Sequence, residues 1–237
     1  MINTYKETHL HRTLKNLYAQ NENAQTEVEK DGVIYDIFTP DEKIIEIQTQ
    51  NLSKLTPKIS NALKKGRFCK IVYPLVTEKI IQTQDENENI ISKRKSPKKQ
   101  TIYSLFKELT GLYPVLLHKN FTLEVLFVKT KEIRLKTKEK LQSENKRRRF
   151  KKNWQKIDKK LLEINEKKIF KTKEDYLNLL PQNLGMEFCS QDLKKEFKNE
   201  QKKDGANYAN LILWVLNKME LITLSKKEKN TKFYKVK

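Results

Sequence analysis

The chain has 237 residues, of which 50 are Lys or Arg and 30 are Asp or Glu, so its formal net charge is +20 at pH 7. This length suffices for one large domain or two modest ones with a buried core, and we expect two. The charge exceeds what solubility requires and predicts a polyanionic partner, although a lysine-rich proteome with AT-rich codons is an alternative explanation.

The two cysteines, Cys69 and Cys189, lie far apart and have no metal-ligand spacing. Neither a zinc site nor a disulfide framework is therefore supported, and both are expected to be small buried residues. No apolar run approaches the ~18 residues of a membrane span, and the amino terminus lacks a signal-peptide core. We expect a cytoplasmic protein that does not contact membranes.

An amphipathic first helix is predicted over residues 7–19, because Leu10 and Leu14 recur at helical spacing. Glu7 falls on the same apolar stripe, where an unpaired carboxylate is costly. A metal or a nearby cation would satisfy this carboxylate. Alternatively, Glu7 lies in a solvated first turn, where the helix dipole favours an acid.

Two strands are predicted next, at residues 33–38 and 43–49, on either side of a turn that contains Pro40. Antiparallel pairing about this turn places Asp36 opposite Ile45 or Glu46, so the two carboxylates become close cross-strand neighbours. Like charges this close repel each other unless a cation lies between them, and a hard divalent cation would serve. The alternative is an ordinary hairpin with Glu46 on its solvent face.

The region that follows is predicted to contain a short helix at 57–65 and two strands at 68–73 and 77–82, separated by Pro74. Residues 92–99 have no apolar periodicity and are predicted to form an exposed loop. The basic residues of this loop are expected to contact phosphates: Lys93, Arg94, Lys95, Lys98 and Lys99.

A helix at 101–109 and a buried strand at 121–128 are predicted from their apolar patterns. Glu124 interrupts this strand, either as a further metal or water ligand or as a paired structural carboxylate.

Residues 129–173 contain nineteen Lys or Arg against six Asp or Glu. Because Ile157, Leu161 and Ile164 recur at near-helical spacing, a connecting helix is predicted over residues 154–170. An excess of one sign of charge favours contact with a nucleic-acid backbone over simple solvation. The residues expected to make it are Lys146, Arg147, Arg148, Arg149, Lys151 and Lys152.

The carboxy-terminal region is predicted to form three helices and a hairpin, at residues 175–180, 190–197, 207–219, 221–224 and 232–236. This order, with a Lys-rich hairpin, resembles a winged helix-turn-helix domain. The resemblance implies that the third helix and the wing contact DNA, although such domains also serve in dimerisation or protein docking. The third helix is expected to have little polar surface beyond its first turn. The residues implied in DNA contact are Asn207, Lys226, Lys227 and Lys229.

Glu7 on the first helix, Asp36 on one strand and Glu46, Ile47 and Gln48 on the next resemble the PD-(D/E)XK nuclease superfamily, which is restriction-endonuclease-like. The resemblance extends over about residues 7–73, through the following helix and strand. Residues 46–49 and 94–97 also resemble segments of an uncharacterised prokaryotic family associated with this fold.

The resemblance implies a catalytic set of Glu7, Asp36, Glu46 and Gln48. Asp36 and Glu46 would bind Mg²⁺, with the Ile47 carbonyl completing the shell, and Glu7 would orient a ligand or water. Gln48 departs from the usual lysine, because glutamine can hydrogen-bond but brings no positive charge. Lys54 or Lys58 on the next helix could supply that cation.

The predicted fold is therefore α/β, with a restriction-endonuclease-like mixed sheet flanked by helices and a winged-helix domain. The predicted domains are a nuclease-like domain at 1–128, a basic helical connector at 129–170 and the winged helix at 171–237.

The predicted function is a Mg²⁺-dependent endonuclease of the restriction or repair type, acting on double-stranded DNA. A homodimer is one expected assembly, since nuclease folds that cut both strands often dimerise. One alternative is a non-catalytic DNA-binding protein or transcription regulator on a degenerate nuclease fold. Another is an RNA-binding or ribosome-associated factor.

Overall fold

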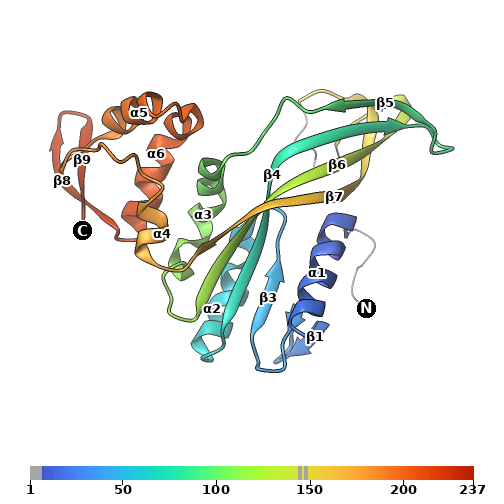
Figure 1. Ribbon diagram of the computed structural model, residues 1–237, viewed down its shortest axis with the longest axis horizontal. Helices are drawn as coiled ribbons and strands as arrows, with labels where there is room; N and C mark the ends of the chain where they lie inside the picture. Colours follow the sequence, from blue (N-terminus) through green and yellow to red (C-terminus); the bar gives the residue numbers. More distant parts are fainter. Residues whose placement is uncertain (1–6, 144–145, 147–148) are drawn as a thin grey trace.

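The computed structural model describes residues 7–143, 146 and 149–237, and its centre is a mixed β-sheet (Figure 1). The strands follow the order β1-β2-β3-β4-β6-β7, and β5 branches from this path by pairing with β4. The helices are α1 (His9–Asn21), α2 (Thr56–Lys64), α3 (Phe106–Leu112), α4 (Lys173–Leu177), α5 (Ser190–Asn199) and α6 (Lys203–Lys218), with 3₁₀ helices η2 (Leu52–Leu55), η3 (Ile102–Leu105) and η4 (Tyr113–Val115). The strands are β1 (Gln25–Lys30), β2 (Val33–Phe38), β3 (Ile44–Ile47), β4 (Cys69–Gln84), β5 (Ile90–Lys95), β6 (Phe121–Leu141), β7 (Lys152–Phe170), β8 (Ile222–Glu228) and β9 (Thr231–Val236).

Helices cover both faces of this sheet, so the predicted α/β class with a mixed sheet flanked by helices is confirmed. Strands β1, β2 and β3 form an antiparallel meander, β3, β4 and β6 run parallel, and β7 returns antiparallel to β6. On one face, Leu10 and Leu14 of α1 pack against Ile37 and Ile45 in one buried cluster. Helices α2 and α3 contribute to the buried cluster on the opposite face. Within the described residues, no helix has both the length and the apolar character to span a membrane.

The first helix and the predicted hairpin form close to their expected positions. Thr8 caps α1, because its Oγ1 accepts a hydrogen bond from the His11 amide. Strand β1 was not predicted, although the sequence contains a signal for it. Asp31 and Gly32 have φ values of 54° and 71°, which is the requirement of the type I′ hairpin turn that Asp-Gly favours.

The predicted interruption at Pro74 is wrong, because β4 runs unbroken through it. The Val72 carbonyl accepts from the Gln48 amide, whereas the Val76 amide donates to the Gln100 side chain. Pro74 lies between Val72 and Val76 and faces the same edge of β4. The last residue of β3, Ile47, pairs with Val72, so β3 does not extend as far as Pro74. Its missing N–H therefore costs no ladder hydrogen bond.

The predicted connecting helix within residues 129–170 is also wrong, because β6 and β7 form a long antiparallel pair there. Register shifts along this pair change which side chains share a face. The apolar spacing therefore does not mark a buried helical stripe, and Ile157 and Ile169 are 48% and 50% exposed. The predicted loop at 92–99 is partly strand, because β5 pairs with β4 through Lys95.

The carboxy-terminal helices and hairpin form in the predicted order and pack against the sheet domain. Tyr103 of η3 contacts Phe197 of α5 with ring centroids 4.9 Å apart, and Tyr113 of η4 contacts Trp214 of α6 at 5.8 Å. The expectation that the third helix has little polar surface is wrong. Helix α6 begins at Lys203, and its exposed face carries Asn207, Asn210, Trp214, Asn217 and Lys218.

Gly111 allows α3 to approach η2, the segment that leads into α2. A Cβ at Gly111 would lie 2.3 Å from the Ser53 Cβ and 3.2 Å from the Ser53 Cα. Helix propensity favours alanine over glycine by about 1 kcal/mol, but overpacking costs about 1–3 kcal/mol. We expect Gly111→Ala to lower the free energy of unfolding by about 1–2 kcal/mol in urea titrations. Adding Ser53→Gly should recover part of the loss, and equal stability of Gly111→Ala and wild type would contradict this packing argument.

Candidate active site

The two predicted metal-binding carboxylates meet where β2 and β3 separate. The ladder between these strands consists of Ile37 opposite Ile45 and Phe38 opposite Ile44. One step beyond it, Asp36 Oδ2 accepts a hydrogen bond from the Ile47 amide at 2.8 Å, and the Asp36 amide donates to Glu46 Oε1 at 3.2 Å.

Each of the two side chains thus takes the place of a backbone partner on the neighbouring strand. This exchange fixes Asp36 and Glu46 side by side, as the predicted hairpin required.

Glu46 is buried beside a lysine from the following helix. Its exposed fraction is 2%, and its Oε1 lies 2.6 Å from Lys58 Nζ. Lys58 lies in the first turn of α2, and its ammonium is 4.8 Å from the centre of the Tyr35 ring. Burial raises the pKa of Glu46 to about 7, the negative charge of Asp36 adds to this rise, and Lys58 opposes it. Proton uptake near neutral pH is therefore expected at this site.

Asp36 is linked to α1 through a histidine. His11 Nε2 lies 3.4 Å from Asp36 Oδ2, and His11 Nδ1 lies 2.5 Å from Glu7 Oε1. Burial raises the pKa of Asp36, but the hydrogen bond and charge of His11, the Ile47 amide and Lys58 outweigh it, so the pKa is lowered. Burial lowers the pKa of His11, but Asp36 and Glu7 outweigh it, so the pKa is raised. The imidazolium form is therefore favoured between the two acids.

Glu7 lies just before α1 and has two cationic neighbours. Its Oε1 is 2.5 Å from His11 Nδ1 and 2.8 Å from Lys15 Nζ, and Lys15 also contacts Glu27 at 2.6 Å. The structure thus brings three predicted site residues, Glu7, Asp36 and Glu46, into one connected cluster. Sequence reasoning did not place His11 in the site, although its position four residues after Glu7 in the predicted helix is a usable signal.

Gln48 is half-buried at the end of β3, and its Nε2 donates to the Gln50 carbonyl at 2.6 Å. Its amide is thus engaged along its own segment. Of the two lysines considered as replacements for the usual cation, Lys54 is exposed and Lys58 contacts Glu46.

The donor set for a metal is small. Among the described residues, no group of three or more His, Cys, Asp or Glu side chains is arranged to hold a metal ion. Asp36 and Glu46 offer two adjacent carboxylates, and the Ile47 backbone carbonyl is a third oxygen in the same segment. Mg²⁺ commonly uses one or two carboxylates, keeps several waters and takes the remaining oxygens from a substrate phosphate. Two carboxylates fit that ion, which would share them with Lys58.

Glu124 belongs to a separate, fully paired environment. It is buried on β6, accepts a hydrogen bond from the Tyr18 hydroxyl and lies 3.7 Å from Lys70 and from Lys167. These partners favour the structural alternative for this carboxylate over a ligand role.

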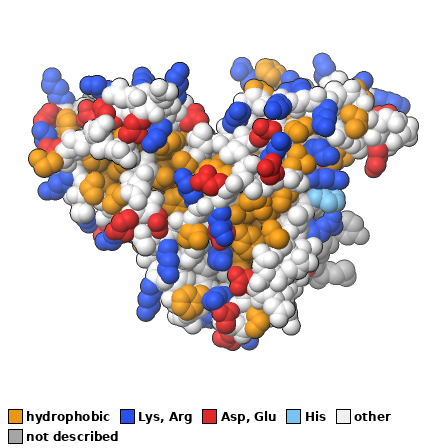
Figure 2. Space-filling model, viewed as in Figure 1, with side chains coloured by type: hydrophobic (Ala, Val, Ile, Leu, Met, Phe, Trp, Pro, Cys, Tyr) orange, Lys and Arg blue, Asp and Glu red, His pale blue; other side chains and the backbone are white. Residues whose placement is uncertain are grey.

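The predicted basic segments, although distant in sequence, meet at one end of the sheet. Strand β5 pairs with the distal part of β4, which pairs with β6 and through it with β7. Figure 2 shows Lys and Arg side chains gathered over this end. Their side chains are exposed at Lys93, Arg94, Lys95, Lys98, Lys99, Lys146, Arg149, Lys151 and Lys152, whereas Arg147 and Arg148 lie outside the described residues.

The predicted DNA contacts of the carboxy-terminal unit are also exposed, at the opposite end of the molecule (Figure 1). Asn207 lies in the second turn of α6, and Lys229 lies in the β8–β9 turn with φ 51°. Lys226 is paired with Glu228 at 2.8 Å, whereas Lys227 is exposed on β8.

Comparisons with known proteins identify a family without an assigned activity. A family model described as "Domain of unknown function (DUF8091)" matches residues 8–171, which include His11, Asp36, Glu46 and Lys58. A Treponema pallidum (strain Nichols) protein, described as "Uncharacterized protein", is 32% identical over 192 residues, covering 81% of this chain and 73% of the relative. No solved structure matches the chain.

Proposed function

This chain belongs to the family described as "Domain of unknown function (DUF8091)", and we propose that it is a Mg²⁺-dependent endonuclease that hydrolyses phosphodiester bonds in double-stranded DNA. The observation that carries the proposal is the exchange of hydrogen bonds between Asp36 and Glu46 at the fork of β2 and β3. Two carboxylates held together with one of them buried carry an electrostatic cost, which a bound divalent cation would relieve. The nuclease-like fold is part of the same proposal, supported by the succession of α1, three strands, α2 and β4.

Each side chain of the cluster has a role in this proposal. Asp36 and Glu46, with the Ile47 carbonyl, would hold Mg²⁺, which when bound lowers the pKa of a water and polarises the scissile phosphate. Lys58 supplies the positive charge that Gln48 lacks, and its ammonium is close enough to Glu46 to offset charge on a phosphate bound there. Glu7 acts through His11, orienting the Asp36 carboxylate. Gln48 can only donate or accept a hydrogen bond.

The exposed lysines and arginines at the distal end of the sheet would hold the DNA backbone. The carboxy-terminal unit has the helix, helix, helix and hairpin order of a winged helix, and in this proposal its hairpin contacts the duplex backbone through the exposed Lys227 and Lys229. Cleavage of both strands would require two active sites, so the proposed active assembly is a homodimer.

A second candidate function has a specific observation in its favour. Lys58 lies beside Glu46 and the His11 imidazolium lies beside Asp36, so the two carboxylates are balanced in charge without a metal, and the Gln48 side-chain amide is engaged with Gln50. A non-catalytic DNA-binding protein, such as a transcription regulator, would have these properties. It would bind DNA through the same basic residues and leave it intact.

A cleavage assay separates the two candidates. Supercoiled plasmid and linear duplex DNA are incubated with the protein in Mg²⁺, Mn²⁺ or chelator. We expect nicking or linearisation with either metal, none with chelator, and a loss of at least about 100-fold in Asp36→Asn, because a carboxylate ligand is removed.

Asp204→Asn, an exposed aspartate of α6, is the matched control and should cleave like wild type. Equal cleavage by Asp36→Asn would identify a contaminant or a different site. Salt-dependent DNA binding without cleavage in any metal would favour the non-catalytic protein.

A further inference from the structure

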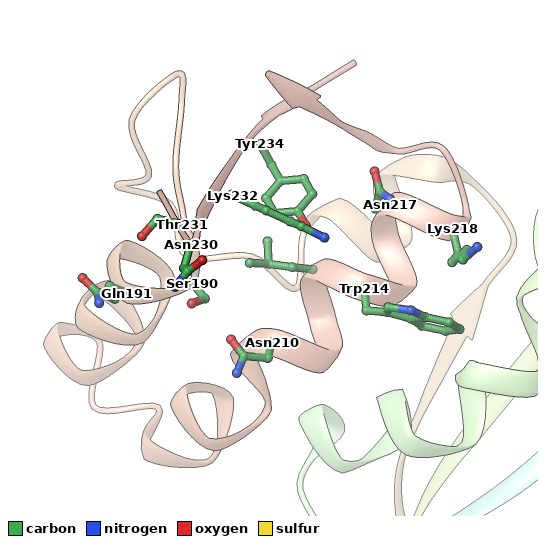
Figure 3. A pocket seen from close by; sticks show the side chains of 11 residues that line it. Ser190, Gln191, Asn210, Trp214, Asn217, Lys218, Asn230, Thr231, Lys232 and Tyr234 are labelled. Atoms are coloured by element: carbon green, nitrogen blue, oxygen red, sulfur yellow. The ribbon is translucent and has the colours of Figure 1, made fainter. Parts of the chain in front are cut away.

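The carboxy-terminal unit contains a polar groove that the proposed nuclease site does not use. Its volume is about 560 Å³. It is bounded by the first turn of α5, the outer face of α6 and the turn and second strand of the β8–β9 hairpin (Figure 3). The side chains that determine its chemistry are Asn210, Trp214, Asn217, Lys218, Asn230 and Lys232.

The lining combines the three kinds of group that bind a nucleotide. Trp214 presents an indole that is 42% exposed, and asparagine amides both donate and accept hydrogen bonds. Lys218 and Lys232 are exposed cations, and no Asp or Glu lies among the lining residues. Within the described residues, the side-chain amides of Asn210 and Asn217 form no hydrogen bond with another side chain or with the backbone.

The aromatic group is held in place before any ligand binds. The Tyr113 ring meets the Trp214 ring at 89°, and the Lys218 ammonium lies 5.9 Å from the indole centre. Lys232 and Tyr234 extend from β9 toward α6 (Figure 3). The groove therefore has Trp214 and Lys218 on its α6 side and Lys232 on its hairpin side.

We propose that this groove binds an unpaired stretch of nucleic acid, with one base stacked on Trp214, the asparagine amides at base edges and phosphates at Lys218 and Lys232. Stacking on an exposed aromatic ring requires a base that has left its own stack, and such contacts are the basis of single-strand recognition. A duplex would instead require a helix that protrudes into the major groove. Here the outer face of α6 forms the floor of the groove between α5 and the hairpin.

This proposal does not depend on hydrolysis, so it is tested in chelator, where the proposed nuclease is inactive. Binding of a fluorescein-labelled single strand of about 12 nucleotides, and of the duplex of the same sequence, is measured by anisotropy. The chain has two tryptophans, Trp154 and Trp214. In a Trp154→Phe background, intrinsic emission reports on Trp214 alone.

We expect the single strand to quench Trp214 emission and to bind more tightly to this groove than the duplex does. Trp214→Ala should weaken single-strand binding by about tenfold, as expected for the loss of one stacked base. Lys218→Gln/Lys232→Gln should weaken it by a similar factor and reduce the salt dependence. This second variant leaves the contact of Trp214 with Tyr113 in place, so it remains informative if Trp214→Ala fails to fold.

Lys195→Gln/Lys198→Gln is the matched control, because it removes the same charge from exposed positions of α5 outside the groove. It should change the affinity by less than about twofold. Equal weakening by both double variants, or unchanged Trp214 emission at saturating single strand, would overturn the proposal. Unchanged single-strand affinity in Trp214→Ala and in Lys218→Gln/Lys232→Gln would also overturn the proposal and would favour a peptide as the ligand of the groove.

Discussion

Replacing Glu46 with glutamine is expected to abolish Mg²⁺-dependent cleavage and, as pH rises, to stabilise the fold relative to wild type. Glutamine keeps the shape of the side chain and can still accept the hydrogen bond from the Asp36 amide. It cannot contribute a negative charge to a metal or take up a proton. We expect cleavage to fall by at least about 100-fold, which corresponds to about 3 kcal/mol of lost transition-state stabilisation.

The stability of the same variant should change in the opposite direction. The pKa of Glu46 is about 7 in the folded protein, against 4.5 as its ordinary value. Between these two pH values the folded state binds more protons than the unfolded state, so the stability of wild type declines as pH rises. Glu46→Gln lacks this titration. Between pH 4.5 and a pH above 7, the unfolding free energy of the variant should therefore rise relative to that of wild type by an amount on the order of 3 kcal/mol.

Urea titrations at several pH values measure this difference. Glu124→Gln is the matched control, because Glu124 is also 2% exposed but lies outside the Asp36 and Glu46 cluster. It should retain cleavage. Parallel pH profiles for Glu46→Gln and wild type would show that Glu46 is not the group that titrates, and retained cleavage would remove it from the proposed mechanism.

Sequence reasoning succeeded where local chemistry and tertiary structure agree. The turn at Pro40 fixes the register of β2 and β3, so the adjacency of Asp36 and Glu46 follows from the sequence alone. The Leu10 and Leu14 stripe similarly predicts α1, whose start is displaced by two residues because Thr8 acts as its cap.

Sequence reasoning failed where strand pairing in the folded protein overrides a local pattern. The spacing of Ile157 and Leu161 matches a helix, but β6 supplies a partner along the whole segment, and register shifts break the two-residue alternation of a strand. Pro74 is tolerated in a long strand only because β3 ends beside it. Neither circumstance can be read from the residues themselves.

The cationic part of the site was only partly predictable. Lys58 follows from its place in the first turn of the next helix, one of two lysines that could reach the carboxylates. The bridging position of His11 depends on how α1 crosses β2, which the periodicity of α1 does not specify. The polar groove beside α6 is formed jointly by α5, α6 and the β8–β9 hairpin, so it cannot be predicted from the sequence of any one of these segments.

Lys58→Met is expected to lower the free energy of unfolding by about 3 kcal/mol at pH 8, because it leaves the buried Glu46 carboxylate without its closest cation. The decrease in unfolding free energy is limited, because the Glu46 carboxylate can take up a proton and become neutral. Lys54→Met, on the exposed surface just before α2, should change stability by less than about 0.5 kcal/mol. The double variant Glu46→Gln/Lys58→Met should recover most of the loss, because no uncompensated charge remains.

The same variant tests whether the carboxylate pair accepts a divalent cation. In wild type, Lys58 competes with Mg²⁺ for Glu46, so the added stability from Mg²⁺ should be modest. In Lys58→Met the Glu46 carboxylate has lost its nearest cation, and Mg²⁺ should raise the melting temperature more than it does in wild type, because a ligand that binds only the folded state stabilises it. Calorimetry with and without Mg²⁺ measures this difference, with Ca²⁺ as a comparison ion. An equal Mg²⁺ response in Lys58→Met and Glu46→Gln/Lys58→Met would mean that any bound cation lies elsewhere, and Lys58 would then be a structural counter-ion.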